Sequence, residues 1–544
     1  MNRWLALSLM LAAFVALALR WPGLDRRPMH ADEAVNARIF QGLWERGEYR
    51  YNPDEYHGPT LHYASLPLAG LSGAKDFSQL SERNLRSVAV LAGLALVILV
   101  ALLRDGLGNV GTAAAALLLA ISPAMVFYSR YFIHEMLLVA FTLLLIGGAW
   151  RYLQSPCAAW AVVAGAGLGL THATKETFII HLVAMGGSLM LMRGWQRWRV
   201  RESTPSKRTW QRSHLALALG VAAGISSILF TSFFQNGHGL VDSVATYLPW
   251  MRRAGGHSPH IHGWSFYFER LFWYRSAKGP LWSEAFIAVL ALVGGVAAWT
   301  RKDPTQPDAM LPRFLVCYAA ATTGAYTIIP YKTPWCLLNF LLPTILLAGV
   351  GAEAIVGALG RLRSAASSRA VSWAAQRLGL TVATLVMAGA AVHLAWQAWR
   401  ASHSWVTHRG NPYTYAQTLP NLLELTDRVR AITAVSPQGA DTTVKVIVPN
   451  SDYWPLPWYL RSLRGVWWLD ALPADPYAPI IIVAANLKAA LDDSSQRRYL
   501  SVGYYELRPR EFLELYVEFE LWKRFVATLP RPSDDDVDSS PLSP

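Results

Sequence analysis

Long apolar segments recur through the first 400 residues and are separated by short polar stretches. A helix needs about 20 mostly apolar residues to cross a bilayer, and about eleven segments approach that length. They lie near residues 4–20, 84–103, 110–127, 133–150, 158–174, 177–192, 214–233, 282–299, 312–330, 337–357 and 380–399. The pattern predicts a mainly α, polytopic bundle of about eleven transmembrane helices.

The first apolar segment, Leu5 to Leu19, is short enough to resemble a signal peptide. No small-residue cleavage motif follows it; Trp21-Pro22-Gly23 and then charged residues come instead. We therefore expect an uncleaved first span.

Basic residues in the short loops predict the orientation. Seven basic residues and one acid lie between residues 193 and 212, and four basic residues and no acid lie between 361 and 377. Such loops stay on the cytoplasmic side, so even-numbered spans end there and the N-terminus is cytoplasmic. The protein is expected in the plasma (inner) membrane, with loops 21–83 and 234–281 and everything after about residue 400 outside.

The chain after residue 400 loses its apolar character and predicts a separate domain. We expect a transmembrane domain over 1–400, an extracytoplasmic α/β domain over 401–530 and a disordered acidic tail over 531–544. In the α/β domain the predicted strands are Val444–Val448 and Ile480–Val483, and the predicted helices are Tyr453–Leu463, Asn486–Leu491 and Phe512–Leu529.

Composition supports the membrane interpretation and excludes others. The chain is 53% hydrophobic and 16% charged, whereas a soluble domain is about 25% charged. The net charge of +13 does not indicate nucleic-acid binding, because the basic residues sit in short loops rather than along one face. The three cysteines are scattered, which predicts neither a disulfide framework nor a metal site.

The first outer loop contains two adjacent carboxylates in His30-Ala31-Asp32-Glu33. A carboxylate in this position can act as a general base that takes a proton from an incoming hydroxyl. Alternatively, Asp32 caps a helix over Glu33–Arg46. The two interpretations are compatible.

The same loop continues with His57-Gly58-Pro59-Thr60-Leu61-His62. Gly-Pro favours a turn that brings His57 and His62 near each other. The alternative is an ordinary turn with two interfacial histidines. A metal pair lacks a third ligand at a suitable spacing.

Two short outer turns carry further charges. Arg130, His134 and Glu135 surround the start of the fourth span, where a carboxylate usually faces a partner or a water-filled cavity; structural pairing of Arg130 with Glu135 is the alternative. In the next outer turn, Lys175 precedes Glu176. A lysine there can bind a phosphate group. The alternative is that its side chain extends to the membrane interface.

A later outer turn, Tyr331-Lys332-Thr333-Pro334-Trp335, adds another cation and an indole. Acids and cations are thereby predicted on one membrane face, a mixture that suits a phosphate leaving group beside a base. It suits a transport pathway less well, because none of these charges lies in the middle of a span.

The arrangement resembles the GT-C membrane glycosyltransferases, the superfamily of protein O-mannosyltransferases and aminoarabinose transferases. The motifs are the first-loop acid in His30-Ala31-Asp32-Glu33, the proline motif His57-Gly58-Pro59, and Arg130 followed by Glu135. Three further motifs are similar to a prokaryotic subgroup, the flippase-activity-associated membrane proteins: Thr174-Lys175-Glu176, Tyr331-Lys332-Thr333-Pro334-Trp335 and Tyr453-Trp454-Pro455-Leu456-Pro457-Trp458-Tyr459. Thr60 stands where the usual motif has a second proline.

The resemblance implies an inverting transferase that moves a sugar from a polyprenyl-phosphate carrier to a protein, lipid or glycan acceptor. It assigns catalysis to Asp32, Glu33 and Glu135, with Asp32 as base, and binding of the donor phosphate to Arg130, Lys175 and Lys332. The supporting residues are His30, His57, His134, Glu176, Tyr331 and Trp335. A divalent metal is compatible with this set but is not required, because the cations can offset the phosphate charge. The alternative is a non-catalytic membrane protein that assists the flipping or assembly of lipid-linked sugars.

Overall fold

The computed structural model describes residues 2–199, 210–255, 258, 260–276, 278–300, 307–365, 372–495 and 498–530. The expected acidic tail over 531–544 lies outside these residues. The chain divides into two compact units. The first comprises Met1–Arg26 and Ile39–Tyr415, and the second comprises Arg27–Arg38 and Ala416–Pro544.

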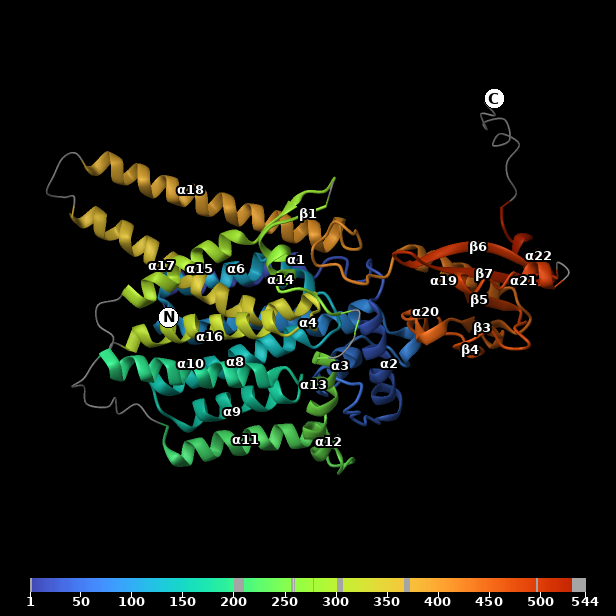
Figure 1. The fold of residues 1–544 in the computed structure, drawn as a ribbon, viewed down its shortest axis with the longest axis horizontal. Helices are drawn as coiled ribbons and strands as arrows, with labels where there is room; N and C mark the ends of the chain where they lie inside the picture. Colours follow the sequence, from blue (N-terminus) through green and yellow to red (C-terminus); the bar gives the residue numbers. More distant parts are fainter. Residues whose placement is uncertain are drawn as a thin grey trace. The chain divides into compact units, whose positions relative to one another are not determined.

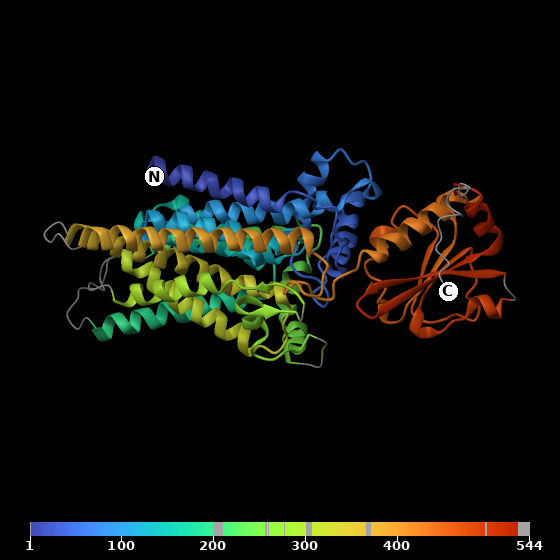
Figure 2. The same ribbon diagram turned by 90° about the horizontal axis from the view of Figure 1, so that it is seen from above.

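The first unit is a bundle of long helices that run side by side (Figures 1 and 2). A helix occupies each of the expected spans: α1 (Arg3–Arg20), α4 (Glu82–Leu99), α6 (Asn109–Ile121), α8 (Glu135–Gln154), α9 (Ala158–His172), α10 (Phe178–Arg199), α11 (Arg212–Phe230), α15 (Ala285–Thr300), α16 (Pro307–Ile328), α17 (Leu338–Ala365) and α18 (Ser372–Trp399). Within the described residues, seven helical segments are long and apolar enough to cross a membrane, and α6, α9 and α15 are shorter apolar helices. The protein is an integral membrane protein, and the predicted mainly helical fold is confirmed.

Small residues let the helices of the bundle approach closely. A Cβ at Gly294 of α15 would lie 2.1 Å from the carbonyl oxygen of Leu347 in α17, and one at Gly351 of α17 would lie 2.0 Å from that of Leu290 in α15. Helices in a bilayer commonly associate at small residues, which let their backbones come close. Close van der Waals packing matters there because lipid supplies no hydrophobic driving force between helices. These glycines therefore fix α15 against α17.

Shorter elements of the first unit lie in or at the edge of the segments expected outside the membrane. They are α3 (Thr60–Leu71), α12 (Gly239–Ala245), α13 (Tyr247–Gly255), α14 (Phe266–Phe272) and the two-stranded hairpin of β1 (Tyr274–Arg275) and β2 (Leu281–Trp282). A further short helix, α7 (Pro123–Tyr128), follows α6 and occupies the end of the third expected span. The division between the two units falls within α2 (Ala31–Arg46), between Arg38 and Ile39.

The second unit is built on a five-stranded sheet in the order β4-β3-β5-β7-β6. The strands are β3 (Val444–Ile447), β4 (Val466–Leu469), β5 (Ile480–Ala484), β6 (Tyr499–Arg508) and β7 (Glu511–Glu518). β4, β3 and β5 are parallel, while β7 is antiparallel to β5 and β6. Helices α19 (Asn421–Ala434) and α22 (Phe519–Val526) pack against each other, α19 also contacting β6 and α22 contacting β7. The predicted C-terminal sheet domain is confirmed.

One predicted helix of this unit, Phe512–Leu529, is wrong in its first part. Residues 512–518 belong to strand β7, and only α22 continues as a helix. β7 lies between β5 and β6 in the sheet, so Leu513, Leu515 and Val517 are buried on one face and Tyr516 on the other. A strand buried on both faces has no clear alternation of apolar and polar residues, which makes it resemble a helix in sequence.

The other two predicted helices are shorter than expected. Within Tyr453–Leu463 only α20 (Leu456–Tyr459) is helical. Asn486–Leu491 contains the end of a 3₁₀ turn and the first residue of α21 (Leu491–Ser494), and Lys488 and Ala490 between them have positive φ. A residue with positive φ interrupts a right-handed helix.

A segment from the first outer loop belongs to this second unit. The Met29 N–H donates a hydrogen bond to the Tyr459 hydroxyl at 2.8 Å. Tyr459 is the last residue of α20. The segment that carries Asp32 is thereby bonded to the α/β domain, although more than 400 residues separate the two in sequence.

Candidate active site

The first outer loop is fixed directly against the turn between α9 and α10. The Gly58 N–H donates to the Thr174 carbonyl at 3.0 Å, and the Thr60 N–H donates to the Ala173 carbonyl at 3.1 Å. The hydroxyls of Thr60 and Thr174 are 2.8 Å apart. A Cβ at Gly58 would lie 2.2 Å from the Ala173 carbonyl oxygen, so only glycine permits this approach.

The next residue of that turn, Lys175, forms a buried ion pair with Glu135 at the start of α8. The side chains are 7% and 2% exposed. Burial alone lowers the pKa of Lys175, but the Glu135 carboxylate outweighs it, so the pKa lies above its ordinary value and the ammonium stays charged. The sequence left open a structural pairing of Glu135 with Arg130; the structure pairs Glu135 with Lys175 instead.

Three histidines gather around this pair. His57 Nδ1 is 2.8 Å from a carboxylate oxygen of Glu176. The rings of His57 and His62 lie 5.3 and 5.8 Å from that of His134. Burial, followed by the charges of His57 and His62, holds the pKa of His134 well below its usual value, and burial lowers the pKa of His62 to about 3. His62 and His134 are therefore neutral at pH 7.

The structure adds two aromatic residues that the sequence did not single out. The indole of Trp250 stacks on His57 with ring centroids 4.7 Å apart. The hydroxyl of Tyr51 donates to Thr246 at 2.9 Å and lies 3.5 Å from Glu176. Both contacts join the loop over 234–281 to the first outer loop. The aromatic content of the two outer loops was the signal available in the sequence, but it did not identify these positions.

Lys332 and its neighbours form a second, adjoining region of the first unit. The Lys332 N–H donates to the His260 carbonyl at 2.8 Å, and its ammonium donates to the Ile329 carbonyl. The Tyr331 ring lies 5.1 Å from that of His260. Trp335 is 7% exposed. The turn over 331–335 is thus bonded to the loop over 234–281.

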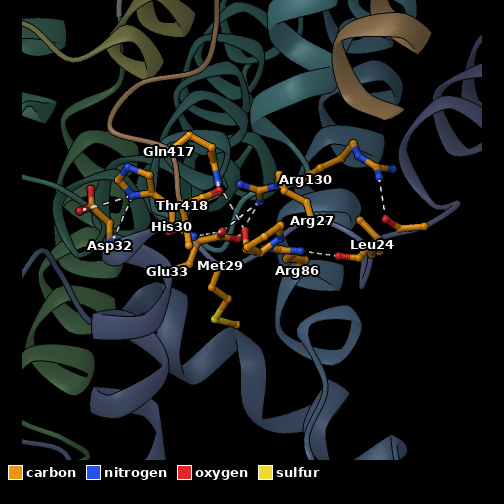
Figure 3. Close-up of polar contacts among 12 residues, drawn as sticks. Leu24, Arg27, Met29, His30, Asp32, Glu33, Arg86, Arg130, Gln417 and Thr418 are labelled. Carbon is orange, nitrogen blue, oxygen red and sulfur yellow. Dashed lines mark hydrogen bonds and ion pairs between the residues drawn. The ribbon is translucent and has the colours of Figure 1, made fainter. Parts of the chain in front are cut away.

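Arg130 has a structural task that the sequence did not predict. Its guanidinium donates to the carbonyls of Arg20, Pro22 and Gly23 at 2.5, 2.7 and 3.1 Å. It thereby satisfies carbonyl groups left without helical partners at the end of α1. Nearby, Arg86 donates to the Leu24 carbonyl at 2.5 Å (Figure 3). Arg130 is buried and fixed by these bonds.

Asp32, Glu33 and His30 lie in the second unit, and the two acids differ sharply. Glu33 is fully buried, pairs with Arg27 at 3.0 Å and accepts the His30 N–H at 2.9 Å (Figure 3). Asp32 is half exposed and lies 3.6 Å from His30 Nδ1. Glu33 rather than Asp32 therefore accepts a backbone N–H at the start of α2. Glu33 stabilises the loop, and Asp32 remains accessible.

Metal ligands do not gather in any part of the chain that the structure describes. No group of three or more His, Cys, Asp or Glu residues there is arranged to hold an ion.

Comparison with known proteins identifies the fold. A family model described as dolichyl-phosphate-mannose-protein mannosyltransferase matches residues 74–222. The crystal structure of ArnT from Cupriavidus metallidurans bound to undecaprenyl phosphate superimposes with a TM-score of 0.58, at 17% identity over 97% of this chain and 99% of that one. The chain has the GT-C fold.

A second structure with the GT-C fold is also similar over most of this chain. The archaeal oligosaccharyltransferase AglB from Archaeoglobus fulgidus, in complex with an inhibitory peptide and a dolichol-phosphate, gives a TM-score of 0.52 at 13% identity. The match covers 96% of this chain and 77% of AglB. A search of curated protein sequences gave no match. The predicted resemblance to GT-C transferases is therefore confirmed at the level of the fold.

Proposed function

We propose that the protein transfers a sugar from a polyprenyl-phosphate carrier to an acceptor hydroxyl on the extracytoplasmic side of the plasma membrane, with its N-terminus in the cytoplasm. The observation that carries this proposal is the buried pair of Lys175 and Glu135, adjoining the His57–Glu176 pair within a GT-C fold. Structures of that fold contain undecaprenyl phosphate or dolichol-phosphate.

In the proposed reaction, the Asp32 carboxylate takes the acceptor hydroxyl proton as the oxygen attacks the anomeric carbon. The bond from that carbon to the phosphate oxygen breaks, the electron pair leaves with the polyprenyl phosphate, and the configuration inverts. Asp32 suits the base role because its carboxylate is accessible, whereas that of Glu33 is committed to Arg27.

Lys175 is the preferred ligand for the leaving phosphate, held in place by Glu135. A fixed cation stabilises charge that develops in the transition state without having to reorganise. Arg130 is the second candidate for binding the phosphate, because its guanidinium already donates to three backbone carbonyls. Lys332 is the third candidate.

The test is reconstitution of the purified protein with polyprenyl-phosphate sugars and candidate acceptors. A base contributes about 10²–10⁴-fold, so Asp32→Asn is expected to lower turnover by that factor while the protein stays folded. Asp25→Asn is the matched control, because Asp25 is an acid of the same outer segment that is 47% exposed and pairs with Arg83. Wild-type turnover in Asp32→Asn would exclude Asp32 as base. Flipping of lipid-linked sugars without any transfer would favour the non-catalytic alternative.

A further inference from the structure

The second unit contains a crevice at the carboxyl ends of its parallel strands. The chain leaves β3 into Val448-Pro449-Asn450 and leaves β5 into Ala485-Asn486, and these segments line the crevice together with the turn between β6 and β7. Ligands of open sheets with parallel strands commonly bind at this edge. The volume is about 210 Å³, below the ~300–1,000 Å³ typical of drug-sized ligands, and it suits a single sugar ring.

Arg508 fixes the walls of the crevice to each other. Its guanidinium donates to the carboxylates of Asp452 at 3.3 Å and Glu511 at 2.6 Å. It also donates to the backbone carbonyls of Asp452 and Trp454 at 3.0 and 3.3 Å. The Arg508 side chain is 11% exposed. The turn between β6 and β7 is thereby clamped to the segment after β3.

Two residues that line the crevice have left-handed backbone conformations. Asn450 has φ of 58° and Arg510 has φ of 72°. A non-glycine residue in this region is strained and persists where the surrounding structure imposes it, often at binding sites. The clamp at Arg508 supplies that constraint.

Several polar side chains that line the crevice are available to hydrogen-bond a ligand. Within the described residues, the amides of Asn450 and Asn486 and the guanidinium of Arg510 make no hydrogen bond to protein. Phe512 also lines the crevice and is 45% exposed. The carboxylates of Asp452 and Glu511 balance the guanidinium of Arg510 in the lining and that of the clamp residue Arg508, so the crevice and its clamp together carry no net charge.

We propose that this crevice binds a neutral carbohydrate. Phe512 would cover the C–H face of a sugar ring, and the amides and carboxylates would bond its hydroxyls. The choice of a carbohydrate rests on the proposed transferase function, and the site would hold the acceptor. Binding itself requires no transfer.

The experiment is saturation-transfer NMR on the full-length protein in detergent, with the methyl glycosides of mannose, glucose, galactose and N-acetylglucosamine as probes. At least one glycoside is expected to bind. Phe512→Ala should weaken it about tenfold, equivalent to about 1.4 kcal/mol, and Asn486→Ala should also weaken it. Phe519→Ala is the matched control, since Phe519 is 41% exposed in the same unit but does not line the crevice.

Absence of binding by all four glycosides would overturn the inference. Equal binding by wild type and Phe512→Ala would also overturn it, as would displacement of the sugar by inorganic phosphate. The outcome is separable from that of the proposed function. Asp32→Asn is expected to bind the glycoside normally while losing transfer. A protein that binds the glycoside at this crevice but never transfers sugar would refute the transferase proposal alone.

Discussion

At the residue scale, the ion pair of Lys175 and Glu135 is the feature for which a structural role and a functional role can best be distinguished. Both side chains are buried. A buried pair is costly to break but is often replaceable by apolar residues without loss of stability. The pair is therefore conveniently tested by comparing single with double substitutions.

Lys175→Ala leaves the Glu135 carboxylate buried without its cation and is expected to destabilise the protein by about 3–5 kcal/mol. The double variant Lys175→Met/Glu135→Leu should recover most of that loss. Thermal unfolding in detergent measures both. If Lys175 binds the donor phosphate, the double variant stays inactive despite its stability. Recovery of transfer in the double variant would make the pair purely structural.

His62 provides a second test at the residue scale. Its folded pKa of about 3 lies below the ordinary value, so the unfolded chain binds the proton more readily. Stability from this residue is complete above about pH 6.5 and is lost as pH falls toward 3, at roughly 1.4 kcal/mol per pH unit.

Both ring nitrogens of His62 lack a partner in the described part of the chain, so His62→Phe should be tolerated near pH 7. The variant is expected to lose less stability than wild type between pH 6.5 and 5. The measurement is the unfolding midpoint across that range. Identical pH profiles of the two proteins would contradict a depressed pKa for His62.

At the scale of elements, the contact of the first outer loop with the turn after α9 assembles the site. Four residues, Gly58, Thr60, Ala173 and Thr174, are joined there by two backbone hydrogen bonds and one between hydroxyls. The side chains of His57 and Lys175 depend on this contact for their placement, because each flanks it in sequence.

Gly58→Ala is expected to separate the loop from the turn, since its Cβ would meet the Ala173 carbonyl at 2.2 Å and backbone cannot readily move aside. The predicted result is loss of transfer in the reconstituted assay, with a lower unfolding midpoint. Gly70→Ala is the control, because a Cβ added at Gly70 would meet no atom within 4 Å and alanine favours its helix. Wild-type turnover in Gly58→Ala would show that the contact does not position the site.

At the scale of the whole molecule, the basic loops predict the orientation of the protein in the membrane. The segment over 193–212 should face the cytoplasm, and the first outer loop should face outward. In a variant without Cys157, Cys317 and Cys336, Asp54→Cys is expected to react with a membrane-impermeant maleimide in intact cells. Ser203→Cys should react only after lysis. The reverse pattern would invert the orientation and refute the extracytoplasmic site.

The apolar pattern alone was enough to place the helices of the bundle, because a bilayer imposes the same length and polarity on every span. The strands β3 and β5 were also predicted, since their β-branched runs are short and continuous. β7 was missed because a strand buried on both faces lacks the alternation that marks it. Local patterns thus identified the elements whose sequences carry a clear signal, such as a long apolar span or a short β-branched run.

The sequence by itself predicted which charged residues gather near the outer membrane face, because charges are rare and costly within apolar spans. Only the tertiary structure decided how they pair. It joined Lys175 with Glu135 rather than Arg130 with Glu135, used Glu33 for an internal ion pair and left Asp32 accessible. Pairing depends on contacts between residues far apart in the chain, such as Gly58 with Thr174. No local pattern encodes such contacts, because the free energy that selects them comes from packing the whole fold.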